Sequence, residues 1–136
     1  MTLHMIRLCV GCDTIDDLLA HRRATAARSE PWRLWTRQTP KAADRLLDGG
    51  SLYRIFKGMI LCRQTLLAVE TVAADRGPMC RITLDERIVR TVPTPRRAFQ
   101  GWRYLEPDDA PADLESEDGG DFPPDLARRL REAGAW

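Results

Sequence analysis

The chain has 136 residues, of which 43% are hydrophobic and 30% charged, a composition typical of a globular domain. This length fits one compact domain rather than two independent cores. No apolar run approaches the ~18 residues of a transmembrane helix and the N-terminus lacks a signal-peptide pattern, so we expect a cytoplasmic protein with no membrane partner.

The net charge of +1 conceals a basic body and an acidic segment. Residues 21–63 carry ten Lys and Arg against three acids, whereas residues 106–121 carry eight acids and no basic residue. Nineteen of the 21 basic residues are Arg, which favours forked contacts with phosphate and stacking on bases. A genome of high GC content would also raise Arg over Lys, so this excess has two possible origins.

The first half of the chain alternates strands and helices. Residues 3–10 predict a strand, because their apolar residues fall on one face. Residues 14–29 predict a helix, since two aspartates in the first turn face the positive end of the peptide dipoles. Residues 32–37 predict a second strand, and residues 40–50 a short helix that starts at a proline and ends at two glycines.

The second half is predicted to be rich in strands. Residues 51–58 and 59–72 predict two strands around Gly58, and residues 80–84 and 87–92 two more. Pro93 and Pro95 then break the regularity, and a loop that carries aromatic residues follows.

Together these elements predict an α+β fold. Short connections favour antiparallel pairing, and closure of a small sheet removes its exposed edges. We therefore expect a small, mostly antiparallel β-barrel with flanking helices, in a single globular domain over residues 1–114. Residues 115–136 are expected to form an acidic linker and a short C-terminal helix.

Several motifs resemble those of a bacterial family of unknown function: the opening MTLHMIRLCVG, then LLDGGSLYRIFKG and FQGWRYL. The resemblance covers most of residues 1–114 and implies no particular chemistry. Cys12 departs from the family motif, in which a non-cysteine residue follows the glycine. Residues 46–70 more weakly resemble the PUA-like superfamily, which includes ASCH and EVE domains. That resemblance implies a small β-barrel, a fold of which many members bind RNA or modified nucleotides.

The stretch AFQGWRYL, residues 98–105, gathers three of the nine aromatic residues of the chain among arginines. Single-stranded nucleic acid is held by bases that stack on flat rings and by cations along its backbone. We therefore predict a binding module for RNA or a nucleotide, with a basic, aromatic-lined pocket; alternatively, the rings only fill the end of the barrel. The predicted nucleic-acid-binding residues are Tyr53, Arg54, Lys57, Arg63, Arg96, Arg97, Trp102, Arg103 and Tyr104.

A second basic feature spans residues 33–45. Lys41 and Arg45 are four apart and share a helix face, with Arg37 close by. Such a stripe suits a phosphate backbone, and it is equally typical of a solvated helix face.

Other classes of function stay open. Cys9 and Cys12 have the spacing of a redox pair or a metal knuckle, but a structural zinc site normally needs two such pairs. We predict no metal and no cofactor, and we assign no catalytic residue. The alternatives are an enzyme that acts on a nucleotide, a Cys-dependent (CxxC) redox protein, or a protein-interaction adaptor that binds through its last helix and Trp136. The chain is expected to be a monomer or a weak homodimer.

Overall fold

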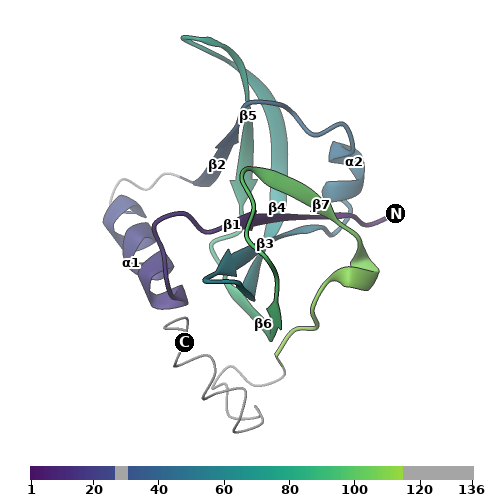
Figure 1. Cartoon of the computed structure of the whole chain (residues 1–136). Coiled ribbons are helices and arrows are strands. Elements are labelled where there is room, and N and C mark those ends of the chain that lie inside the picture. The colour runs from purple at the N-terminus through teal and green to yellow at the C-terminus, as the bar shows by residue number, and fades with distance from the viewer. Residues whose placement is uncertain (27–30, 115–136) are drawn as a thin grey trace, which may run out of the picture.

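The computed structural model describes residues 1–26 and 31–114. Within them, seven strands form one open sheet in the order β2-β5-β4-β3-β1-β7, and β6 pairs with β4 outside this path (Figure 1). The strands are β1 (His4–Leu8), β2 (Trp32–Thr36), β3 (Ser51–Phe56), β4 (Met59–Ala74), β5 (Gly77–Leu84), β6 (Val89–Pro95) and β7 (Trp102–Leu105). The helices are α1 (Ile15–Ala26), α2 (Ala43–Leu46) and the short 3₁₀ helix η1 (Pro107–Asp109).

The 16-residue strand β4 organises the sheet. Its first half pairs with β3 and β6, and its second half pairs with β5, all antiparallel. The ends of β4 and β5 continue beyond the other strands as a projecting hairpin (Figure 1). β2 pairs with β5 and forms one end of the strand order.

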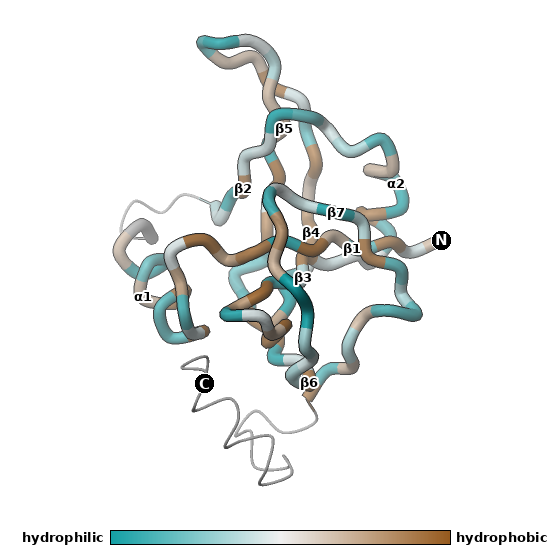
Figure 2. Tube along the Cα trace, in the orientation of Figure 1, coloured by the Kyte–Doolittle hydropathy of each residue, from teal (hydrophilic) through white to brown (hydrophobic). Residues whose placement is uncertain are grey.

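β1 lies between β3 and β7, to which it runs parallel and antiparallel, respectively. All six residues of β3 are buried, so both faces of the sheet are covered at this point. Figure 2 shows the hydrophobic segments along β1 and β3 in the centre of the fold. This double coverage explains why β3 lacks the alternation of apolar and polar residues that marks a half-exposed strand.

The core divides into two clusters. The larger one includes Leu46, Leu52 and Phe56, and it receives Ile15 and Leu18 from α1. The smaller one consists of Ile6, Tyr53, Ile55, Ile60 and Leu105. Burial of each large aliphatic side chain stabilises the fold by about 1.5–3 kcal/mol.

The order of the helices and of the first six strands agrees with the prediction from sequence, but two details differ. The segment predicted as a loop contains β7, which pairs with β1. β6 continues through Pro93 to Pro95, and its register against β4 shifts between Ile60 and Cys62. Pro93 lies at this interruption of the ladder, where its missing N–H is tolerated.

The expectation of a closed barrel is not confirmed. In the described part of the chain β2 and β7 end the strand order and do not pair, so the sheet is open and mixed. The parallel pairing of β1 with β3 is the exception in an otherwise antiparallel arrangement. The predicted linker and helix of residues 115–136 lie outside the described residues. No helix among residues 1–26 and 31–114 has the length and apolarity to cross a membrane.

Candidate functional site

A hollow of about 660 Å³ opens beside β1, β2 and β7. We call it the Trp102 hollow. Strand pairing explains why Arg7 and Trp102 both line it: Arg7 of β1 is paired directly with Trp102 of β7, and paired residues place their side chains on the same face of a sheet. Residues that line it include Arg7, Trp35, Arg37, Gln38, Gly101 and Trp102.

Trp102 is held in place by Tyr104. The two rings meet edge to face, with centroids 5.0 Å apart and planes at 79°. The backbone N–H of Ala42 donates to the Tyr104 hydroxyl at 3.1 Å, which anchors that ring to the residue before α2. Trp102 also packs against the larger core cluster. One indole of the hollow is therefore fixed before any ligand arrives.

The other indole and the two arginines remain available. Trp35 is 46% exposed, and Arg37 follows directly after β2. Neither Arg7, which is half-buried, nor Arg37 forms an ion pair or side-chain hydrogen bond with the described residues. Among the described residues no carboxylate lines the hollow, so nothing in this part of the chain offsets its positive charge. This combination suits an anion that carries a flat ring.

A second hollow, of about 240 Å³, also borders Arg7. We call it the Trp32 hollow, and its lining includes no carboxylate from residues 1–26 and 31–114. Arg54, which is buried, donates from Nε to Gln64 Oε1 at 2.7 Å and lies 5.6 Å from the centroid of the Trp32 ring. Lining residues include Arg7, His21, Trp32, Arg33, Leu34 and Arg54.

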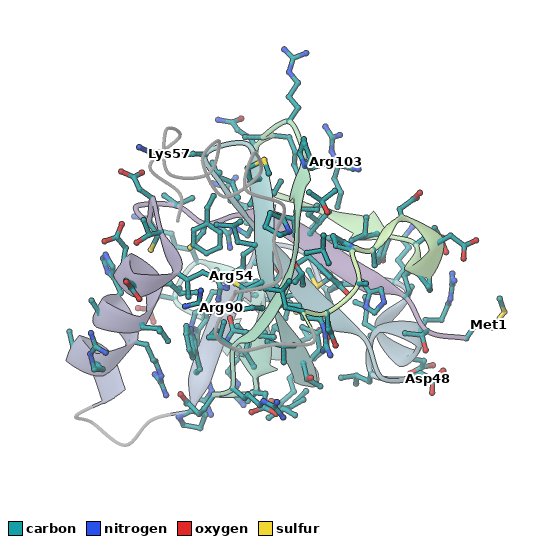
Figure 3. All side chains as sticks on the ribbon, turned by 90° about the horizontal axis from the view of Figure 1, so that it is seen from below. Met1, Asp48, Arg54, Lys57, Arg90 and Arg103 are labelled. Carbon is teal, nitrogen blue, oxygen red and sulfur yellow. The ribbon has the colours of Figure 1, made fainter. Side chains whose placement is uncertain are left out.

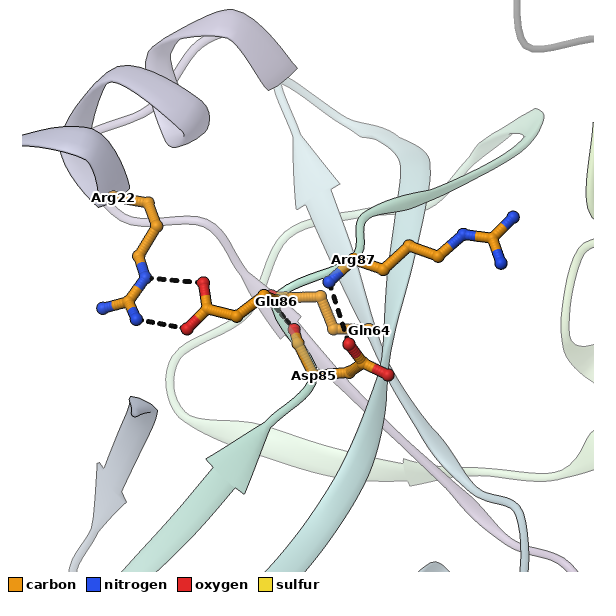
Figure 4. A network of polar contacts seen from close by, with 5 residues as sticks. All are labelled: Arg22, Gln64, Asp85, Glu86 and Arg87. Atoms are coloured by element: carbon orange, nitrogen blue, oxygen red, sulfur yellow. Dashed lines mark hydrogen bonds and ion pairs between the residues drawn. The ribbon is translucent and has the colours of Figure 1, made fainter. Parts of the chain in front are cut away.

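A polar network behind this hollow joins α1 to the corner between β5 and β6 (Figure 4). The Arg22 guanidinium forms a two-pronged ion pair with Glu86 and lies 5.2 Å from the centroid of the Trp32 ring. Gln64 donates from Nε2 to the carbonyl of Asp85 at 2.9 Å. Contacts from α1 and from β4 therefore hold the lining residues Trp32 and Arg54 in place.

Two of the predicted site residues, Tyr53 and Arg63, lie elsewhere, in a polar hollow of about 320 Å³ that we call the Tyr53 hollow. Arg63 donates to Ser51 Oγ and to both carboxylate oxygens of Asp113. Tyr53 is only 4% exposed, and its burial raises the pKa of its hydroxyl. Burial and the charge of Arg63 lower the pKa of His4, which accepts a hydrogen bond from the Ser51 N–H.

The other predicted cations do not converge on the Trp102 hollow either. Lys57 Nζ lies 3.6 Å from Asp13 Oδ2, and the Arg103 guanidinium lies 4.2 Å from the centroid of the Phe99 ring. Figure 3 shows Arg54 within the fold and Lys57 at its margin. Arg96 and Arg97 line none of the three hollows described above. The three hollows therefore do not bring all nine predicted residues together: Trp102 lines one, Arg54 another, and Tyr53 and Arg63 a third.

Two residues of the Trp102 hollow, Arg7 and Trp35, were not predicted as site residues. Arg37 was noted only as part of a basic stripe, whereas Trp102 was predicted directly. The available signal was the segment WRLWTR, a predicted strand in which Trp35 lies two residues from both Arg33 and Arg37 and so shares their face. Pairing of β1 with β7 brings Arg7 beside Trp102, and the lining of the hollow shows that Trp35 and Arg37 lie next to them.

The four cysteines, Cys9, Cys12, Cys62 and Cys80, are buried and unbridged. Burial is the main reason why the pKa of Cys9 and that of Cys62 rise to about 12. Among residues 1–26 and 31–114, no group of three or more His, Cys, Asp or Glu side chains is arranged to hold a metal ion. Burial of Cys9 and Cys62 disfavours the thiolate that redox chemistry requires.

Comparison with known proteins agrees with the first resemblance noted from sequence. A family model described as "Protein of unknown function (DUF1489)" matches residues 5–136. No curated protein and no solved structure matches the chain.

Proposed function

The chain belongs to the DUF1489 family, and we propose that it binds RNA or a nucleotide in the Trp102 hollow. The observation that carries this proposal is the juxtaposition of two indoles, Trp35 and Trp102, with the guanidinium groups of Arg7 and Arg37, which have no acidic partner among the described residues. The rings offer stacking surfaces to a base, and the guanidinium groups offer forked donors to a phosphate. The volume of about 660 Å³ lies within the range of small-molecule sites.

The proposal differs from the prediction made from sequence in the residues that it uses. Trp102 stays at its centre, with Tyr104 as the ring that positions it. Arg63 is engaged by Asp113 and Arg54 by Gln64, so neither is a first choice for phosphate in this hollow. Arg7 and Arg37 take that role instead.

The test is a binding titration with a single-stranded RNA oligonucleotide at about 50 mM salt, followed by fluorescence anisotropy. Trp35→Ala is the main variant, because this residue is 46% exposed and belongs to neither core cluster. Loss of one stacking surface is expected to weaken binding roughly tenfold. If the unaltered protein does not bind RNA at this salt concentration, the proposal is wrong.

Arg7→Gln and Arg97→Gln form a matched pair for the charged part of the site. Both remove one positive charge, but only Arg7 lines the Trp102 hollow. We expect Arg7→Gln to weaken RNA binding by several-fold more than Arg97→Gln. Equal losses would mean that binding depends on overall charge and not on this hollow.

The proposal also covers the cell compartment and the oligomeric state. We propose a cytoplasmic protein that acts as a monomer or weak homodimer. A PUA-like relationship stays a prediction, since it depends on the motif in residues 46–70. The adaptor alternative depends on Trp136 and the last helix, which lie outside the described residues.

A further inference from the structure

We infer that the ligand is a phosphodiester-linked chain of at least two nucleotides rather than a free mononucleotide, an inference that rests on the proposed function. The observation behind it is that the Trp102 hollow and the Trp32 hollow both border Arg7. A single half-buried guanidinium without an acidic partner among the described residues therefore stands where the two hollows meet.

The sizes of the two hollows favour a ligand with two parts. The Trp102 hollow, at about 660 Å³, is large enough for a nucleotide. The Trp32 hollow, at about 240 Å³, is smaller than most complete ligand sites, which begin at roughly 300 Å³. It suits one part of a ligand whose remainder lies in the Trp102 hollow.

The linings favour the same division. Leu34 and the mostly buried Trp32 contribute apolar lining to the smaller hollow, and Arg33 adds an exposed cation. Within the described part of the chain neither hollow has a carboxylate in its lining, so these residues present no like charge to a polyanion. The linking phosphate would lie at Arg7, one nucleoside against Trp35 and Trp102, and the next base in the Trp32 hollow.

The experiment compares three adenine probes by titration calorimetry: AMP, ADP and the 5′-phosphorylated dinucleotide pApA. ADP matches the additional phosphate charge of pApA but has no second base. We expect pApA to bind at least about tenfold more tightly than either AMP or ADP, because only pApA fills both hollows. Equal affinity of AMP and pApA, or of ADP and pApA, overturns the inference and leaves the proposed function standing.

Two variants separate the hollows. Arg33→Gln changes an exposed residue of the Trp32 hollow and should reduce the preference for pApA over AMP while AMP affinity stays constant. Trp35→Ala should weaken both probes. If Arg33→Gln weakens AMP and pApA equally, the Trp32 hollow is not a second subsite and the inference fails. If no probe and no RNA oligonucleotide binds, the proposed function fails as well.

Discussion

Arg63 and Asp113 form a two-pronged ion pair, in which Nε and Nη2 of the guanidinium donate to the two carboxylate oxygens at 2.7 and 2.8 Å. The pair connects the segment after η1 to β4. Backbone hydrogen bonds also join this segment to β6, because Val92 N–H donates to the Ala112 carbonyl and Leu114 N–H donates to the Arg90 carbonyl. An arginine predicted to bind nucleic acid is thereby neutralised by the chain itself. The start of the acidic segment is thus a structural part of the fold.

Replacement of Asp113 by Asn should lower stability in a pH-dependent way. The hydrogen bond from Arg63 lowers the pKa of the Asp113 carboxyl in the folded protein. A lowered folded pKa stabilises the fold above the unfolded value near 3.9, and this contribution is lost as pH falls below it. We expect a loss on the order of 1 kcal/mol at pH 7 for this partly exposed pair, measured by urea unfolding.

The same titration at pH 4 and below provides the check on this ion pair. The difference between the unaltered protein and Asp113→Asn should narrow as the carboxyl becomes protonated. Asp108→Asn, a neighbouring change on η1 at an exposed position, should have little effect at any pH. A stability difference that stays constant across this pH range would rule out the charge of Asp113 as its cause.

Gln64 should contribute more to the stability of the fold than a neutral side chain usually does. It is fully buried, accepts from Arg54 Nε at 2.7 Å and donates to the Asp85 carbonyl at 2.9 Å. Gln64→Leu leaves a buried guanidinium without this acceptor, so we expect a loss of about 2–3 kcal/mol in the free energy of unfolding. The double variant Arg54→Met/Gln64→Leu should lose less than the sum of the single changes, because both polar partners are then absent. Additive losses would contradict this coupling.

The elements that sequence analysis predicted well are those with strong local signals. β1 shows alternating apolar residues, and α2 lies between a proline and two glycines. β7 was missed because it has only four residues, WRYL, directly after Gly101, and its pairing partner β1 lies almost a hundred residues earlier. The parallel contact of β1 with β3 likewise depends on the whole fold. Long-range pairing of this kind leaves no local pattern to read.

The kinds of residue that line the candidate site could be predicted from the sequence, but not which residues lie there together. Aromatic rings beside arginines pointed to Trp102, which does line a basic hollow. The structure places Tyr53 and Arg63 in a different hollow from Trp102. Ile6 pairs with both Tyr53 and Arg103, whereas Arg7 pairs with Trp102, so the sheet separates Tyr53 from Trp102 onto opposite faces.

Gly50 is expected to be the least replaceable glycine before β3. A Cβ at this position would overlap the carbonyl oxygens of Leu3 and Leu46, both of which are backbone atoms. Gly50→Ala must therefore displace the end of α2 or the start of β1, and we expect a loss of about 3 kcal/mol in unfolding free energy. Gly49→Ala is the control: its φ of +80° is strained for alanine, but its Cβ meets only Thr2 Oγ1 at 4.0 Å. That control should lose about 1 kcal/mol; equal losses would exclude the overlap as the cause.

Alkylation by iodoacetamide distinguishes a structural Cys9 from a redox-active one. A pKa of about 12 leaves on the order of 10⁻⁵ of the Cys9 thiol ionised at pH 7, and the thiolate is the form that reacts. Cys9 should therefore stay unmodified in the native protein, as should Cys62, and mass spectrometry should detect modification only after denaturation. Denatured protein serves as the control, since its exposed thiols have ordinary reactivity. Rapid native labelling of Cys9 would contradict this environment and favour the CxxC redox alternative over a nucleotide-binding module.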